Sequence, residues 1–107
     1  SFDNNEEWCK QTGSKFTNSY MSLEINGCKN NLECVFIDCA PGELRKDLLV
    51  KWKDTPLLIV HDTEPGADYV YGMKDILSTF KYRLDYQPEG FPHTTAVSNT
   101  INVCTWI

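Results

Sequence analysis

Cysteine is the residue type that says most about the chemistry of this protein. Five cysteines occur among 107 residues, and this density in a short chain is typical of secreted proteins whose thiols form disulfides. The polar, acidic start, 1–7, is that expected of a mature N-terminus after signal-peptide cleavage. The alternative is a cytosolic protein with free thiols. Zinc is not expected, because no Cys-x2-Cys pair occurs and His61 and His93 lie far from the cysteines in sequence. His61, next to Asp62, is expected to be a solvent-exposed strand-end residue rather than a ligand or base. No other metal and no cofactor is expected.

Spacing limits how the cysteines can pair. Cys34 and Cys39 fall on one expected strand, about 16 Å apart at about 3.3 Å per residue, whereas a disulfide requires Cα atoms within roughly 7 Å. Cys28 can therefore pair with one of them or with neither. Cys9 and Cys104 lie near the two ends, where a bridge would staple the termini and remove about 4–5 kcal/mol of unfolded-state entropy. One thiol would remain, either buried or able to link two copies of an otherwise monomeric protein.

Hydropathy patterns and turn residues predict the elements that must position these side chains. A helix is expected over 14–26, with Ser14 as its N-cap and Gly27 after its last turn. Turn residues occur at 63–68, and a helical turn is expected at 73–77. Alternating apolar residues or short apolar runs predict strands at 32–39, 48–53, 57–61, 80–86, 94–97 and 101–106. One early helix followed by strands is an α+β pattern, with the helix packed on an antiparallel sheet.

Composition favours a single domain over 1–107. Hydrophobic residues make up 41% of the chain, and no apolar run approaches the roughly 18 residues of a membrane span. The net charge of −5 argues against a protein that depends on non-specific phosphate contacts. Four cations project from the polar sides of predicted strands and could share one surface, through which any RNA binding would be weak and salt-dependent: Lys51, Lys53, Lys81 and Arg83.

Several short motifs resemble those of one protein family. The segments 52–58 and 92–99, the latter running on to Cys104, are similar to the catalytic-carboxylate strand and the terminal segment of the small guanyl-specific fungal ribonucleases. The segments 80–84 and 103–106 are similar to the last strands of a derived group, the RNase-like secreted effectors of powdery mildew fungi. The chain departs from that group in two ways. It has three extra cysteines, and Trp8 immediately precedes Cys9, whereas one residue usually separates the aromatic residue from the cysteine.

This resemblance implies a fold and a biological role. The fold would be microbial-ribonuclease-like, with one N-terminal helix on a curved antiparallel sheet, stapled by a Cys9–Cys104 disulfide and a second bridge from Cys28 to Cys34 or Cys39. The protein would be a secreted fungal virulence effector that acts in the cytoplasm of host plant cells. It would bind a host plant protein, and an intracellular plant immune receptor would recognise it as an avirulence protein.

The resemblance also implies where a ribonuclease site would lie. Asp54 would be the general base, His93 the general acid, and Lys81 or Arg83 the cation that holds the phosphate. The set is incomplete, because the Tyr-x-His element of those enzymes has no counterpart at 36–39. Asp54 is also one methylene shorter than their glutamate, and a positional error near 1 Å can cost about 100-fold in rate. The chain is therefore expected to be a pseudo-ribonuclease without catalytic activity.

Protein binding is expected to fall on two loops, 63–71 and 87–92. They carry Tyr69, Tyr71 and Phe91, which are residue types enriched at binding hot spots. Exposed loops on a stapled scaffold can vary in sequence at little cost to stability. The competing interpretation of each aromatic residue is ordinary core packing.

The pattern also fits other classes of protein. Cys39, Trp52 and Cys104 follow the Cys…Trp…Cys order of an immunoglobulin-like binding module. Against it, only three residues follow Cys104, and Asn102 stands where the usual tyrosine would be. The disulfide map separates the two, because a Cys9–Cys104 bridge favours the ribonuclease-like fold and a Cys39–Cys104 bridge favours the sandwich. The sequence is also compatible with an active guanyl-type ribonuclease and with a small secreted inhibitor or toxin.

Overall fold

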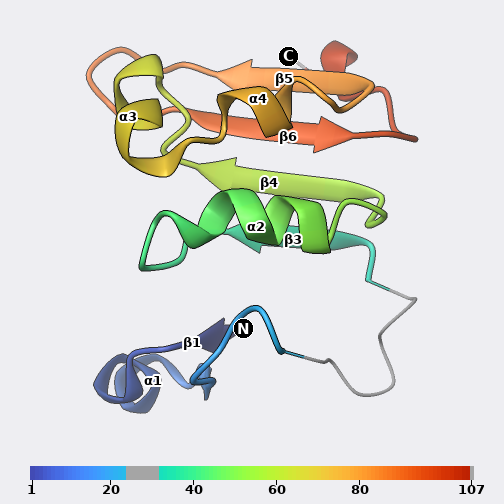
Figure 1. The fold of residues 1–107 in the computed structure, drawn as a ribbon. Coiled ribbons are helices and arrows are strands. Elements are labelled where there is room, and N and C mark those ends of the chain that lie inside the picture. Colours follow the sequence, from blue (N-terminus) through green and yellow to red (C-terminus); the bar gives the residue numbers. More distant parts are fainter. Residues whose placement is uncertain (24–31, 107) are drawn as a thin grey trace.

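A computed structural model describes residues 1–23 and 32–106. Its centre is a four-stranded sheet in the order β3-β4-β6-β5, formed by β3 (Cys34–Ile37), β4 (Leu57–His61), β5 (Tyr82–Tyr86) and β6 (Thr94–Ser98) (Figure 1). The predicted α+β fold class is confirmed. β4, β6 and β5 pair antiparallel, but β3 runs parallel to β4, with Ile37 beside Val60. The expectation of a fully antiparallel sheet is therefore wrong.

The parallel pair exists because a helix, α2 (Leu44–Lys51), connects the end of β3 to the start of β4. Parallel neighbours need a crossover of this kind, since a tight turn would reverse the chain direction. The strand predicted at 48–53 is therefore wrong. Leu48 and Leu49 are both buried whereas Val50 is exposed, and two adjacent buried residues suit a helix better than the alternation of a half-buried strand.

The core lies between one face of the sheet and the helices α2 and α4 (Lys74–Leu77), which cover that same face (Figure 1). Alternate strand residues point toward the helices, so Leu58, Val60 and Val97 are fully buried together with Leu49 of α2. This packing fixes the ends of β3 and β4 relative to α2. Side chains that follow those two strands are consequently held close to the first turn of the helix.

Two connections meet at the end of the sheet where β3 and β4 finish. The first runs from β4 to β5 through η1 (Pro65–Ala67), α3 (Asp68–Tyr71) and α4, and the second joins β5 to β6 over residues 87–93. The predicted turn and helical turn in the first connection are confirmed by η1 and α4. Because Thr94 begins β6 beside His61 at the end of β4, the second connection and the start of the first, which includes α3, lie at the same end of the sheet (Figure 1). The first connection then crosses the sheet to the start of β5 at the other end.

The N-terminal segment forms a second, two-stranded sheet. β1 (Phe2–Asp3) and β2 (Lys15–Phe16) pair in parallel, joined by α1 (Glu6–Thr12). The Asn5 side chain caps the start of α1, and Gly13 ends the helix at a φ of 76°. The helix predicted at 14–26 is wrong over its described part, because the helix lies earlier and ends before Ser14. Residues 24–31 are outside the described part of the chain.

Asn4 and Tyr20 join this N-terminal segment to the main sheet. Asn4 donates a hydrogen bond from Nδ2 to the carbonyl oxygen of Ala40 at 2.6 Å, just beyond β3. Its backbone N–H donates to the hydroxyl of Tyr20 at 3.0 Å, and the Tyr20 ring is buried in the main core. Burial raises the pKa of the Tyr20 hydroxyl, which keeps it neutral as the acceptor of this bond.

The C-terminal segment also differs from the prediction. Residues Val103–Thr105 form a short 3-10 helix, η2, in place of the strand predicted at 101–106. Asn102 caps η2 by accepting a hydrogen bond from the backbone of Cys104, and Val103 is buried. Trp52 is the C-cap of α2 and not a strand residue, so the α+β fold does not have the central feature of an immunoglobulin-like sandwich. No helix among the described residues is long and apolar enough to cross a membrane.

Four described cysteines are free thiols: Cys9, Cys34, Cys39 and Cys104. The helix α1, which contains Cys9, lies at the opposite end of the molecule from the C-terminal segment, which contains Cys104 (Figure 1). Cys28 falls outside the described residues. The disulfide staple is therefore not confirmed. The parallel β3–β4 pair also leaves the microbial-ribonuclease-like arrangement unconfirmed.

Candidate functional site

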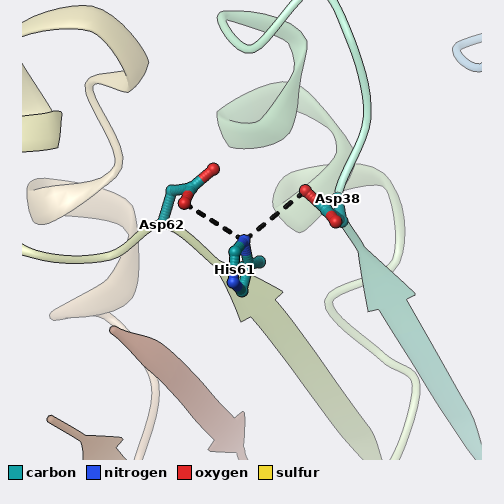
Figure 2. A group of neighbouring side chains, drawn as sticks. All are labelled: Asp38, His61 and Asp62. Carbon is teal, nitrogen blue, oxygen red and sulfur yellow. Dashed lines mark ion pairs between the residues drawn. The ribbon is translucent and has the colours of Figure 1, made fainter. Parts of the chain in front are cut away.

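A cluster of polar side chains lies where the parallel strands β3 and β4 end. Asp38 follows β3, His61 is the last residue of β4, and Asp62 comes next (Figure 2). Arg45, in the first turn of α2, reaches the same place from the helix. Parallel strands bring their carboxyl ends to one edge of a sheet, and ligands of open α/β sheets commonly bind outside that edge. The cluster is therefore a candidate functional site.

Arg45 is the centre of this cluster. The side chain is only 7% exposed, and its guanidinium donates to Oδ2 of Asp62 at 2.9 Å and to Oδ1 of Asp38 at 3.1 Å. It also donates from Nε to the carbonyl oxygen of Cys39 at 3.1 Å and from Nη1 to that of His61 at 3.0 Å. A buried charge is tolerated only when it is paired and hydrogen-bonded, and Arg45 meets both conditions.

Tyr71 covers this guanidinium from the α3 side. The carbon atom at the centre of the Arg45 guanidinium lies 4.4 Å from the centre of the Tyr71 ring, a cation–π distance. The Tyr71 hydroxyl is 3.5 Å from Oδ2 of Asp62. Gly42 lies against this ring, so that a Cβ atom at this position would collide with the Tyr71 side chain. Tyr71, predicted to be a binding residue, is thus half-buried and packed in the cluster.

His61 points its ring at both carboxylates. Its Nδ1 atom lies 3.1 Å from Oδ1 of Asp62 and 3.7 Å from Oδ1 of Asp38 (Figure 2). Nδ1 is buried, and no described group meets it with proper hydrogen-bond geometry. An Nδ1 that faces two carboxylate oxygens is stabilised when it carries a proton, because a lone pair there would be repelled. The arrangement therefore favours a proton on Nδ1.

Asp62 combines a perturbed carboxyl group with an unusual backbone. Its burial alone would raise the pKa, but the hydrogen bond from Arg45 and the charges of His61 and Arg45 outweigh burial and hold the pKa below the ordinary value of 3.8. Its φ is 60°, in the left-handed region that aspartate tolerates better than most residues. This conformation lets one carboxylate face Arg45 and His61 together.

The same three side chains have the spacing of metal ligands. One ligand atom from each of Asp38, His61 and Asp62 lies within 4.8 Å of the others. Both carboxylates are already paired with Arg45, whose guanidinium supplies the positive charge that a metal ion would bring. A cation would have to compete with that pair, so the geometry describes an internal ion-pair network better than a metal centre. The neighbouring Cys39 thiol is buried, which raises its pKa and makes it a poor nucleophile.

The predicted ribonuclease residues are not brought together. Asp54 lies in the turn between α2 and β4, and Lys81 immediately precedes β5, so both are at one end of the sheet. His93 precedes β6 at the other end, where its backbone N–H donates to Glu64 at 2.9 Å. The five residues of β4 separate these ends by about 13 Å at about 3.3 Å per residue. A general base and a general acid that act on one phosphate cannot be so far apart.

The four predicted RNA-binding cations do not share a strand surface. Lys51 lies on α2 and donates from Nζ to the carbonyl oxygen of Met21 at 2.7 Å, and Lys53 follows the same helix. Arg83 lies beside Val97 on the helix-covered face of β5 and pairs with Asp85 at 3.0 Å. The prediction rested on placing all of these residues on the polar sides of strands, and that placement is wrong.

The two predicted binding loops meet at the end of the sheet that holds the cluster. Tyr69 on α3 is 96% exposed and Phe91, between β5 and β6, is 71% exposed. Two aromatic side chains that the fold does not bury therefore lie on the two connections that meet at this end of the sheet.

A pocket of about 420 Å³ opens beside Tyr69. Met73 and Leu77 are its most deeply buried members. Its remaining lining is Asp62, Thr63, Glu64, Pro65, Asp68, Lys74 and Arg83. The pocket thus combines buried apolar side chains with several charged groups and one exposed aromatic ring.

Sequence reasoning missed Asp38 and Arg45 and interpreted His61 as an isolated strand-end residue. The available signal was that polar residues follow two apolar strand candidates, Asp38 after one and Asp62 after the next. That signal has meaning only if the strands are parallel, which requires α2 to be recognised as a helix. Comparison of the chain with protein-family models, curated proteins and solved structures finds no match. The family implied by the sequence motifs therefore stays a prediction.

Proposed function

We propose that this protein acts by binding another protein through the end of the sheet that carries Tyr69 and Phe91, and that it does not cleave RNA. The observation that carries the proposal is the exposure of these two aromatic side chains on adjacent connections, 96% and 71%. Large aromatic residues supply much of the energy of protein interfaces when a partner covers them. The ion-pair network of Arg45, Asp38 and Asp62 lies at the same end of the sheet.

The absence of ribonuclease activity is supported by the separation of its candidate residues. Asp54 and Lys81 lie at the opposite end of the sheet from His93, so no single phosphate reaches all three. Purified protein should therefore leave guanosine-containing RNA intact. Turnover that His93→Ala and Asp54→Ala abolish would overturn this part of the proposal.

The sequence resemblance supplies the biological setting of the proposal. A relative of the RNase-like secreted effectors of powdery mildew fungi would be secreted, enter plant cells and bind a host protein in the cytoplasm. In resistant plants an intracellular immune receptor would recognise it. A binding surface built from exposed aromatic residues suits such a role, since it can change in sequence without disturbing the core.

The test replaces both aromatic side chains without removing the loops. The loop 63–71 contains Glu64 and Tyr71, which bond to other parts of the fold, so an exchange of the whole loop would confuse binding with stability. Tyr69→Ala with Phe91→Ala should abolish the cell-death response in leaves of a resistant host and leave the thermal midpoint unchanged.

Phe36→Ala is the matched control, because Phe36 is 59% exposed on β3 and lies outside the two loops. This variant should be recognised like the wild type. Recognition that survives the double substitution, or that Phe36→Ala removes instead, would place the contact surface elsewhere.

A further inference from the structure

We propose that the pocket beside Tyr69 receives an arginine or lysine side chain of the partner protein. This inference rests on the proposed function, because it names the chemistry that the same surface recognises. It is carried by the pocket volume, about 420 Å³, by its buried apolar members and by carboxylates that have no cation of their own.

The apolar part of the pocket suits the long stem of a basic side chain. Met73 and Leu77 are each 2% exposed and line the pocket from the α4 side. Arginine and lysine bury their methylene groups along apolar surface while the charged head remains among polar groups. A pocket with both kinds of lining therefore fits these residues better than a purely aliphatic or a purely polar one.

The charges of the lining separate into two groups. Asp62 shares the charge of Arg45 with Asp38, and Arg83 is paired with Asp85, so neither lining residue offers an unpaired charge to a ligand. Glu64 and Asp68 are different, because among the described residues neither forms a salt bridge.

Hydrogen bonds hold these two carboxylates in place. Oε2 of Glu64 accepts from the backbone N–H of His93 at 2.9 Å, and Oδ1 of Asp68 accepts from that of Lys74 at 2.7 Å. Each carboxylate keeps a second oxygen that can accept from an incoming cation. The lining is therefore pre-positioned for a guanidinium or ammonium group.

Tyr69 provides a further contact for a cation. Its side chain lines the pocket and is almost fully exposed, so the ring face is available to a guanidinium or ammonium group. Lys74 is the one lining cation without a described salt bridge, and it should oppose such a ligand. Glu64 and Asp68 outnumber Lys74, so the unpaired charge of the lining is net negative and would repel phosphate, which argues against RNA in this pocket.

The experiment titrates the 107-residue protein with the peptide acetyl-Gly-Gly-Arg-Gly-Gly-amide and follows backbone amide shifts by NMR. The matched probe carries citrulline in place of arginine, which has nearly the same shape and no charge. We expect the arginine peptide alone to shift the amides of 62–74, and we expect the shifts to shrink as salt screens the charges.

Charge-removing variants that keep a hydrogen-bond acceptor sharpen the test. Glu64→Gln and Asp68→Asn should each weaken binding about two- to fivefold, and Lys74→Gln should strengthen it by a similar factor. Glu89→Gln is the control, since Glu89 is exposed on the β5–β6 loop and does not line the pocket. It changes the net charge by the same amount and should leave the affinity unchanged.

Equal shifts with the citrulline peptide, or equal effects of Glu64→Gln and Glu89→Gln, would overturn the inference. Its failure is distinct from failure of the proposed function. If the arginine peptide does not bind but Tyr69→Ala with Phe91→Ala still abolishes host recognition, the surface is correct and the ligand chemistry is wrong. If the peptide binds and recognition survives the double substitution, the pocket is real and the proposed function is wrong.

Discussion

Arg45 joins the ends of two strands to a helix through one guanidinium. Replacing it with methionine would leave Asp38 and Asp62 beside each other without their cation, and Asp62 is partly buried. Breaking a buried ion pair from one side costs about 3–5 kcal/mol. We expect Arg45→Met to lower the free energy of unfolding in urea by that amount.

Lys46→Met is the control for this loss, because Lys46 is the exposed neighbour on α2. It should change the free energy of unfolding by less than about 0.5 kcal/mol. Equal losses in the two variants would show that helix charge, and not the ion-pair network, determines stability.

Asp62 should make stability depend on pH in the acid range. Its pKa is lower in the folded protein than its ordinary value of 3.8, so the unfolded chain binds the proton more readily. Its contribution is therefore fully present above the ordinary value and is lost as the pH falls through the lower, folded pKa. We expect the unfolding free energy to fall from about pH 4 downward, and to fall less steeply in Asp62→Asn. Parallel pH profiles for the two proteins would contradict this.

At the residue scale the sequence predicts which side chains are exposed better than it predicts which side chains form ion pairs with one another. Tyr69 and Phe91 lie on the two segments predicted as exposed loops and are exposed, whereas Tyr71 of the same segment is half-buried. Arg45 has no local signal, because its partners are 7 and 17 residues away and meet it only after β3, α2 and β4 have assembled. The candidate cluster was therefore beyond the reach of local sequence pattern.

Leu49 and Val50 distinguish the helix from the predicted strand. On a strand 48–53, Leu48 and Val50 would face the core and Leu49 would face away. In α2, Leu49 is fully buried and Val50 is 48% exposed. We expect Leu49→Ala to cost about 2–5 kcal/mol of unfolding free energy and Val50→Ala less than about 1 kcal/mol. A larger loss for Val50→Ala would indicate the strand.

Gly42 should tolerate no side chain while Tyr71 covers Arg45. A Cβ atom at Gly42 would collide with the Tyr71 ring, so Gly42→Ala must displace the ring or the β3–α2 connection. We expect a loss of about 1–3 kcal/mol in urea unfolding.

Gly66→Ala provides the comparison for that substitution. Nothing lies within 4 Å of a Cβ at Gly66, and this variant should be near neutral. Adding Tyr71→Ala to Gly42→Ala should give less than the sum of the two separate losses, because the collision has gone. Additive losses would mean that the ring is not what excludes the side chain.

At the scale of elements, all four strands of the main sheet are predictable because their own residues carry the signal, with β3 inside the apolar run predicted at 32–39. β4 is a short apolar run, β5 alternates between Tyr82, Leu84 and Tyr86, and β6 follows a turn. The segment 48–53 also alternates, yet it forms a helix, because the crossover between parallel strands requires one there. Local periodicity could not reveal that requirement, so the parallel direction of β3 relative to β4 could not be predicted either.

The relative reactivity of the four described cysteine thiols tests the fold of the whole molecule. Cys34 and Cys104 are exposed, whereas Cys9 and Cys39 are buried. Burial also raises the pKa of the Cys39 and Cys34 thiols, so less thiolate is available at either site. In a brief alkylation of folded protein followed by peptide mass analysis, Cys104 should be modified first and Cys34 next, well before the buried pair. A cross-linked peptide that contains Cys9 and Cys104 would contradict this order and establish the predicted staple.

The attachment of the N-terminal segment through Asn4 and Tyr20 has a consequence for how the protein comes apart. Protein structures open in cooperative units, and a unit held to its neighbour by a few polar contacts and one buried ring has a lower opening free energy than a central strand. Release of the Asn4 bond to Ala40, with withdrawal of the Tyr20 ring and of the Phe2 ring that packs against the core, would free α1 and both short strands together. Amide hydrogens in this segment should therefore exchange with solvent through a partial opening. Those of β4 and β6 should exchange only through global unfolding.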